Sequence, residues 1–258
     1  MTAPIVQTRQ LSLSIGKRTL CDQLDLSVTA GQRLAVLGQN GSGKTTLLHS
    51  LLKLCPADAS RIEIDGRTLT HWSRAELAKT VGILFQDNHD DMPSSVHETV
   101  MLGRLPHLQA WRWESAKDFA LAESALKTVG LENAAHRDVS TLSGGERQRL
   151  AIASLLTQAP RLYLLDEPSN HLDISFQIRT LKLLADTVER EGSGLIMATH
   201  DINLAARFCD QVLLLFGDGH YLLGAQQEVL TDAALTRAYG CEIRHVVTEA
   251  GRFYFPVV

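Results

Sequence analysis

The sequence contains few of the features that mark secreted, membrane-spanning or nucleic-acid-binding proteins. Its four cysteines are scattered with no CxxC pair, so neither a zinc site nor a disulfide framework is indicated. Met1 is followed by polar residues instead of the apolar segment of a signal peptide, and no apolar run approaches the ~20 residues of a membrane span. The net charge of −4 gives no broad basic surface, which argues against nucleic acid as a partner. We therefore expect a soluble, cytoplasmic protein with reduced thiols.

The strongest local pattern is a glycine-rich stretch, Gly38–Thr45, between the apolar run 34–37 and an apolar helix start. It fits G-x-x-x-x-G-K-[ST], in which glycines let backbone N–H groups wrap a phosphate at a helix N-terminus. Lys44 can reach the β- and γ-phosphates, and the Thr45 hydroxyl can hold Mg²⁺. A glycine-rich surface turn would match by chance only about once in a hundred chains of this size. The predicted phosphate-binding residues are Gly38, Asn40, Gly41, Ser42, Gly43, Lys44, Thr45 and Thr46.

The apolar patterns along the chain predict a mixed α/β fold. Residues 5–28 alternate apolar and polar side chains, as short antiparallel strands do. Residues 87–140 lack strand patterns and contain helical ones, so we expect a helical subdomain inserted into an α/β core. The expected helices there are 95–103, 114–129 and a short 133–138 segment, with Pro106, Trp111 and Trp113 in the link between the first two. Elsewhere we expect strands at 61–66, 80–85, 161–166 and 194–199, helices at 44–54, 73–78, 174–191, 201–209 and 226–239, and hairpins over 211–223 and around 249–251.

A second motif places two acids, Asp166 and Glu167, after the buried strand pattern 162–165. We expect this strand to lie beside the phosphate-loop strand, where Asp166 could hold Mg²⁺ and Glu167 could polarise an attacking water. Adjacent residues of an extended chain point to opposite sides, which suits two separate roles. Taken alone, the pair could equally be a charged strand end before a loop.

A third motif, LSGGE at Leu142–Glu146, precedes an apolar helix. Ser143, Gly144 and Gly145 at a helix N-terminus form a second anion-binding surface. Ser143 and Glu146 also fit a capping box, although a cap does not need two glycines. Two phosphate surfaces with one magnesium site suggest that two copies pair head to tail, each lending this surface to the nucleotide of the other.

Together these motifs resemble the ATP-binding subunit of an ABC transporter. The resemblance covers nearly the whole chain and implies an α/β fold: a P-loop NTPase (RecA-like) mixed-sheet core with an N-terminal antiparallel β-subdomain and an inserted α-helical subdomain. It implies one ABC ATPase domain over 1–258, with the catalytic core in 1–86 and 150–258 and the helical subdomain, which carries LSGGE, in 87–149.

The resemblance also assigns roles to single residues. Gln86 corresponds to the glutamine that links magnesium and attacking water to the helical subdomain, and His200 to the histidine that contacts the γ-phosphate. The run 169–173 matches the D-loop, which crosses the dimer interface. Ile15 stands where the family usually has an aromatic residue that stacks on adenine, so stacking is lost and only apolar contact remains. The implied cofactors are ATP and Mg²⁺, with Thr45, Gln86 and Asp166 as magnesium ligands and Glu167, His200 and Gln86 as catalytic residues.

Three softer similarities point to importers of ferric siderophores, haem and cobalamin: the segments 96–107, 173–175 and 239–256. The resemblance then implies ATP hydrolysis that drives import of a metal chelate. The implied partners are integral membrane permease subunits, a second copy of this chain and, indirectly, a substrate-binding protein. The chain would lie at the cytoplasmic face of a bacterial inner membrane as a peripheral protein. The acidic segment 87–91 is expected to dock a basic permease helix, with metal binding as the alternative.

An ABC transporter subunit for a different cargo is an alternative within the same family, and two other function classes fit less well. The run 166–173 is also similar to soluble ABC proteins that act on ribosomes or nucleic acid, but those generally carry two ATPase domains and a charged linker. Each motif occurs once in this sequence, and the net charge is negative. A GTPase would be expected to carry an Asn-Lys-x-Asp motif, which the sequence lacks.

Overall fold

A computed structural model describes residues 3–57, 61–86, 93–108, 113–170, 172–249 and 251–257. The acidic segment 87–91, expected to dock a permease helix, lies outside these residues. Within the described ranges, none of the helices combines the length and the apolar character needed to cross a bilayer.

The centre of the molecule is a six-stranded sheet with the order β10-β9-β3-β8-β7-β6. Five of its strands run parallel, namely β3, β6, β7, β8 and β9, and β10 is antiparallel to β9. Ala198 pairs with Val36 on one side and with Asp166 on the other, so β8 separates the phosphate-loop strand from the strand that ends in Asp166. The prediction that these two strands are neighbours is therefore wrong, because β8 lies between them and pairs with one edge of each. The strands are β3 (Arg33–Leu37), β6 (Val81–Leu84), β7 (Leu162–Asp166), β8 (Gly194–Ala198), β9 (Gln211–Leu215) and β10 (Tyr221–Ala225).

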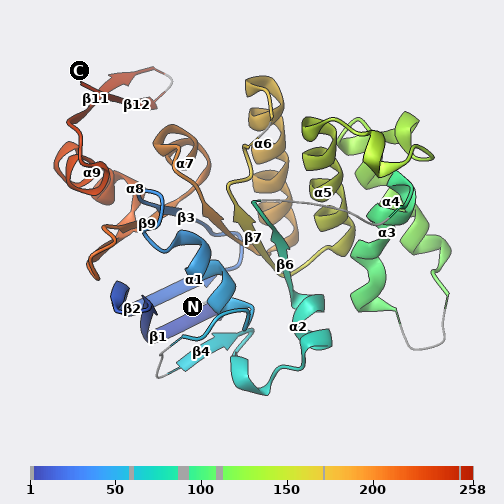
Figure 1. The fold of residues 1–258 in the computed structure, drawn as a ribbon, viewed down its shortest axis with the longest axis horizontal. Coiled ribbons are helices and arrows are strands. Elements are labelled where there is room, and N and C mark those ends of the chain that lie inside the picture. The colour runs from blue at the N-terminus through green and yellow to red at the C-terminus, as the bar shows by residue number, and fades with distance from the viewer. Residues whose placement is uncertain are drawn as a thin grey trace.

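Successive residues of the central strands enter two different cores, because side chains alternate across a sheet. Leu34 and Leu164 face one core, and their neighbours Ala35 and Leu165 face the other. The first core includes α1 (Lys44–Leu51) and an antiparallel sheet of order β2-β1-β4-β5, which lies below the central sheet in Figure 1. This first side contains β1 (Pro4–Ile15), β2 (Arg18–Thr29), β4 (Arg61–Ile64), β5 (Arg67–Thr68), the 3₁₀ turn Leu69–His71 and α2 (Arg74–Thr80).

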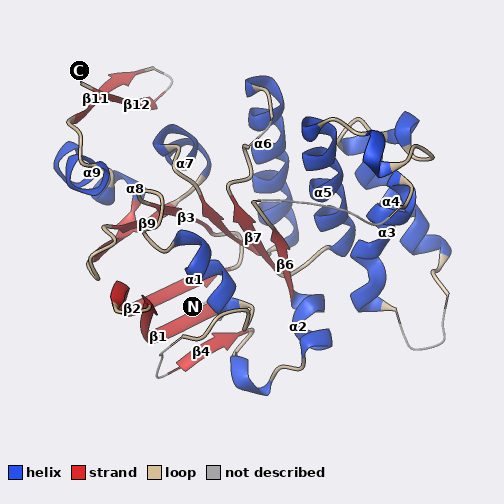
Figure 2. Cartoon of the chain, viewed as in Figure 1, coloured by secondary structure: helices blue, strands red, loops and turns tan. Residues whose placement is uncertain are grey.

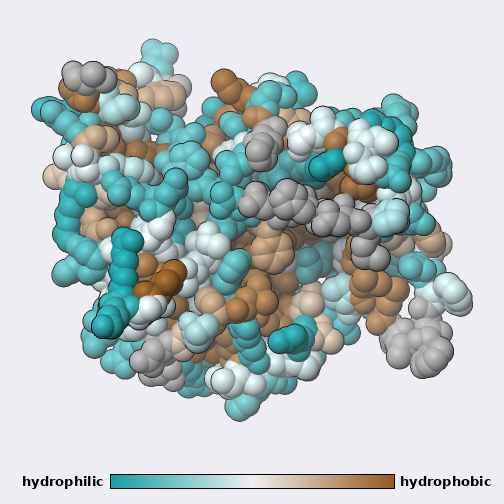
Figure 3. Space-filling view, viewed as in Figure 1, coloured by the Kyte–Doolittle hydropathy of each residue, from teal (hydrophilic) through white to brown (hydrophobic). Residues whose placement is uncertain are grey.

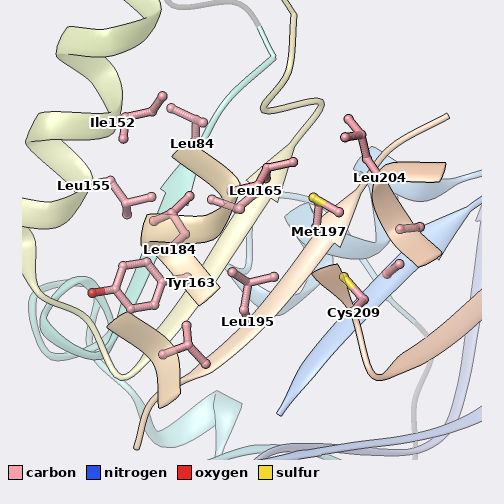
Figure 4. Close-up of a cluster of buried hydrophobic side chains, with 14 of the residues drawn as sticks. Leu84, Ile152, Leu155, Tyr163, Leu165, Leu184, Leu195, Met197, Leu204 and Cys209 are labelled. Carbon is pink, nitrogen blue, oxygen red and sulfur yellow. The ribbon is translucent and has the colours of Figure 1, made fainter. Parts of the chain in front are cut away.

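Helices cover the second face of the central sheet. Figure 4 shows Ile152 and Leu155 of α5 (Gly144–Gln158) and Leu184 of α6 (Ile174–Glu191) around Tyr163 and Leu165. Helix α6 begins and ends where its apolar spacing predicted, capped by Asp173 and by Gly192 in the left-handed conformation. This packing fixes the two strand ends that carry Asp166 and His200.

The region expected to be helical contains α3 (Val96–Met101), α4 (Ala116–Thr128) and a 3₁₀ helix, Leu102–His107 (Figures 1 and 2). Pro106 lies inside the 3₁₀ helix and not in a link, and residues 132–141 form two 3₁₀ turns instead of one short helix. Arg104 joins this region to α5: its Nε donates to Asp118 at 2.7 Å and its Nη1 to the Thr157 carbonyl at 3.0 Å. The division into a core of 1–86 and 150–258 and a subdomain of 87–149 stays a prediction.

The C-terminal part differs from expectation at one point. Residues 226–239 form two helices, α8 (Gln226–Val229) and α9 (Asp232–Tyr239), instead of one. The Thr231 side chain accepts a hydrogen bond from the Ala234 N–H and so starts a new helix. Helix α7 (Ile202–Phe208) is capped by Asp201 as predicted, and β11 (Ile243–Thr248) and β12 (Gly251–Pro256) form the expected hairpin.

Candidate functional site

The phosphate loop connects the end of β3 to the start of α1, and its glycines are required by close contacts. Gly43 has φ 108°, and a Cβ there would lie 2.9 Å from Leu20 Cβ. A Cβ on Gly38 would lie 2.6 Å from the Leu215 carbonyl oxygen and from Ser42 Oγ. Both positions exclude a side chain, so the backbone can lie close to a phosphate at the N-terminus of α1.

Lys44 is buried beneath this loop. Its Nζ donates to the carbonyls of Gly38 at 2.9 Å and Gln39 at 3.3 Å, and lies 3.8 Å from Glu167 Oε1. Burial lowers the pKa of Lys44, whereas the nearby carboxylates of Glu167 and Asp166 oppose that shift. The loop thus holds a cation next to the helix end that favours anions.

Asp166, at the end of β7, carries a buried carboxylate that lacks hydrogen-bond donors in the described ranges. Within the described part of the chain, neither of its oxygens has a hydrogen-bond partner of acceptable geometry. Burial raises the pKa of Asp166, and the nearby Thr45 hydroxyl, which is not in hydrogen-bonding geometry with the carboxylate, lowers it only in part. Such a group is costly to bury unless a cation pairs with it.

These residues fit Mg²⁺. A hydroxyl, a carboxylate and an amide oxygen are hard ligands, and Mg²⁺ usually takes one or two carboxylates together with substrate phosphates. Thr45 and Gln86 line the same cavity beside the loop. Among the described residues there is no cluster of three or more His, Cys, Asp or Glu side chains that could hold a metal by themselves, so phosphate oxygens would complete the coordination.

Glu167 and His200 form a direct pair at the ends of neighbouring strands. His200 Nδ1 lies 2.8 Å from Glu167 Oε2, and the Glu167 N–H donates to the Ala198 carbonyl at 2.9 Å. Glu167 has φ 48°, an uncommon left-handed conformation for a residue other than glycine. The expectation of an extended backbone at Glu167 is therefore wrong, although the two acids still differ in position, since Glu167 lines the cavity described below and Asp166 does not.

Most of the predicted site residues meet at one open cavity of about 380 Å³. The Ile15 side chain, 60% exposed, lies at its wall and offers an apolar surface. Gly38, Ser42 and Asp166 lie behind the cavity lining, where Ser42 and Asp166 are buried. The lining also includes Asn170, which was not predicted individually, although the D-loop similarity over 169–173 pointed to its neighbourhood. The lining residues are Ile15, Asn40, Gly41, Gly43, Lys44, Thr45, Thr46, Gln86, Glu167, Asn170 and His200.

The second predicted anion-binding surface, Ser143–Gly145, lies outside this cavity, whose lining contains none of these three residues. Ser143 caps α5: its N–H donates to Glu146 Oε2 at 2.8 Å, and its Oγ accepts from the Glu146 N–H at 3.3 Å. The predicted capping box is confirmed. The hydrogen bonds from Ser143, with support from Arg137, hold the pKa of Glu146 down to about 2.

One buried contact connects this helix to the catalytic strand. Gln148 Nε2 donates to the Pro168 carbonyl at 3.3 Å, one residue after Glu167. No sequence motif identified Gln148, because its partner is a backbone atom distant in the sequence.

Comparison with known proteins identifies the family. The ABC transporter family model matches residues 21–170, more than half of the chain. The chain belongs to the ABC transporter ATP-binding family. It is 35% identical over 243 residues to the ferric enterobactin transport ATP-binding protein FepC of Escherichia coli (strain K12), covering 93% of this chain and 89% of FepC. It is 39% identical over 248 residues to the hemin import ATP-binding protein HmuV of Deinococcus radiodurans, covering 94% and 92%.

A solved structure agrees over nearly the whole length. An ABC transporter assigned to the metal-chelate type, in an inward-facing conformation, matches with a TM-score of 0.85 at 27% identity, covering 99% of this chain and 98% of that chain. The ABC ATPase fold predicted from the sequence, with its N-terminal antiparallel sheet, mixed main sheet and helical region, is confirmed. The chain is an ABC-type ATPase that binds ATP.

Proposed function

We propose that two copies of this ATPase pair head to tail, hydrolyse Mg·ATP between them and drive import of a metal chelate through a membrane permease. The observation that carries the proposal is the separation of two anion-binding surfaces. Lys44 and Glu167 meet at the cavity, whereas Ser143–Gly145 lie apart from it. A second copy in head-to-tail arrangement would supply the missing wall of each site.

The proposed chemistry follows from the contacts at the cavity. Lys44 and the loop N–H groups bind the phosphates, and Ile15 provides apolar contact for the base. Thr45, Gln86 and Asp166 would hold Mg²⁺, which when bound neutralises charge on the phosphates. Glu167 accepts a proton from the attacking water, and its contact with His200 keeps the carboxylate oriented. His200 also contacts the γ-phosphate.

The surface of the helical region supports a permease partner. Brown, hydrophobic residues are visible over this region in Figure 3, and its exposed side chains include Leu102, Leu105 and Trp113. Exposed apolar groups of this kind often mark sites of protein interaction. By sequence alone, the segment 87–91 carries three aspartates that would suit a basic permease helix.

The proposed cargo rests on the relatives. FepC is named for ferric enterobactin transport and HmuV for hemin import, and the matching solved transporter is assigned to the metal-chelate type. We propose a ferric siderophore, haem or a related chelate as the cargo. Its recognition would belong to the permease and a separate substrate-binding protein.

Co-purification tests the proposal directly. The tagged chain, extracted from native membranes with mild detergent, should be recovered with permease subunits, and the complex in vesicles should take up a chelate only with ATP. Recovery with ribosomes instead of a permease would overturn the importer assignment. Charge reversal of Asp90 and Asp91 to lysine should weaken permease-stimulated hydrolysis, and unchanged coupling would contradict docking at 87–91.

A further inference from the structure

Tyr239 connects α9, the last helix of the chain that the structure describes, to the nucleotide site. The proposed mechanism assigns this residue no role. Tyr239 is the last residue of α9, and Gly240 ends the helix in the left-handed conformation. The Tyr239 hydroxyl donates to the His200 carbonyl at 3.3 Å, and the Tyr239 carbonyl accepts from Gln39 Nε2 at 2.5 Å. One residue therefore touches both the phosphate loop and the end of β8.

The surroundings of the phenol keep it protonated. Burial raises the pKa of Tyr239, and the Gly38 backbone N–H lies close enough to the hydroxyl to oppose that shift in part. The oxygen can then accept from Gly38 while its proton goes to the His200 carbonyl. The hydroxyl thus bridges the first residue of the loop and the residue that carries the imidazole.

The two bridged segments carry the groups that face each other across the reaction. Lys44 Nζ donates to the carbonyls of Gly38 and Gln39, the two loop residues that Tyr239 contacts. The His200 imidazole is paired with Glu167 on the other side. A change in the position of Tyr239 would therefore alter the distance between the phosphate-binding loop and the carboxylate that acts on water.

We infer that Tyr239 is a positioning residue that sets the spacing between the phosphate loop and the Glu167–His200 pair. The inference rests on the roles proposed above for Glu167 and His200. It assigns to the C-terminal helix a part in hydrolysis, although no atom of Tyr239 lines the cavity.

Tyr239→Phe tests this inference in the full-length protein, because it removes only the hydroxyl. The matched control is Tyr221→Phe, which removes a hydroxyl that donates to the Gln23 carbonyl at 3.0 Å, away from the cavity lining. Steady-state hydrolysis, binding of a fluorescent ATP analogue and thermal unfolding are measured for both. Loss of one positioning hydrogen bond should lower kcat about three- to ten-fold in Tyr239→Phe, with KM for ATP changed less than about two-fold. Tyr221→Phe should keep the original kcat.

Two results would overturn the inference. One is a kcat of Tyr239→Phe equal to that of Tyr221→Phe. The other is a parallel loss of kcat, ATP binding and thermal stability, which indicates a purely structural residue. Glu167→Gln is measured alongside: if it keeps normal hydrolysis, the proposed roles at the site are wrong, and the inference falls with them. If it is inactive while Tyr239→Phe is normal, the inference alone is wrong.

Discussion

The cavity beside the phosphate loop and the N-terminus of α5 are both anion-binding surfaces by sequence, but their local structures differ. Beside the cavity, Lys44 is buried and donates to two loop carbonyls, whereas the buried Asp166 carboxylate has no hydrogen-bond partner among the described residues. A bound metal and phosphates would supply partners for both charges. At α5, Ser143 and Glu146 satisfy each other in a closed capping box at an exposed helix end. A bound cation would give the Asp166 carboxylate the partner that it lacks among the described residues. The capping box at α5 is already closed, and the first N–H groups of that helix remain available to an anion. This difference suits a cavity that binds first and a lid supplied later by another copy.

Glu167→Gln should produce the largest difference between the two surfaces. Loss of the general base should lower hydrolysis by about 10²- to 10⁴-fold, whereas ATP binding should persist because Lys44 and the loop are unchanged. Hydrolysis rates and binding of an ATP analogue provide the measurement. Lys44→Ala, which removes the lysine of the phosphate loop, serves as the control that loses binding. Near-normal turnover in Glu167→Gln would contradict the assignment of the base.

Gly145→Asp tests whether α5 serves another copy. An acid in the first helical turn favours the helix but repels phosphate, so the variant should fold, bind ATP at its own cavity and fail to hydrolyse it. When it is mixed with Glu167→Gln, mixed pairs regain one intact site out of two. Random pairing should then restore about a quarter of the original activity. Gly145→Ala, which adds no charge, is the control, and no recovery in the mixture would contradict head-to-tail sharing.

Asp166→Asn should separate stability from function at the cavity. Because burial penalises the Asp166 charge more than Thr45 and Lys44 compensate for it, removing that charge should stabilise the ligand-free chain by about 1–3 kcal/mol. The variant should also lose the extra stabilisation that Mg·ATP gives. Denaturant unfolding with and without Mg·ATP measures both effects. The matched control is Asp118→Asn, a buried aspartate paired with Arg104 and Ser115, which should destabilise the chain. Equal destabilisation of both variants would show that Asp166 is already satisfied.

The smallest expected effect is at the α5 cap and depends on pH. The pKa of Glu146 is lowered from 4.5 to about 2, so its contribution to stability is present above about pH 4.5 and is lost as the pH falls toward 2. The difference in unfolding free energy between the original chain and Glu146→Gln should be constant near neutral pH and shrink below pH 4.5. The Ser143→Ala background should reduce this pH dependence, since the Ser143 hydroxyl helps to lower the pKa. A difference that does not change with pH would contradict the role of the charge.

The parts of the site that sequence predicts best are local. Gly38–Thr45, the capping box at Ser143 and the strand end at Asp166 are each recognisable from residues that are close together in the sequence, and the structure has all three. What sequence missed depends on contacts between distant segments or on backbone turns. These include the insertion of β8 between β3 and β7, the left-handed conformation of Glu167, and the contact of Tyr239 with His200. Thr231 starts a new helix through its own side chain, a break in the predicted helix that apolar periodicity alone does not reveal.

The alternation of the central strands between two cores also bears on how the chain unfolds. Leu164 belongs to the core shared with the antiparallel sheet, and Leu165, its neighbour, to the core shared with α5 and α6. Neither layer can detach without exposing one face of the strands that the other layer still needs, so the strands tie the two layers into one cooperative unit. Amide hydrogens of β3, β7 and β8 should accordingly exchange only in openings as large as global unfolding. A nucleotide bound at the ends of these strands would then protect regions of the chain that it never contacts.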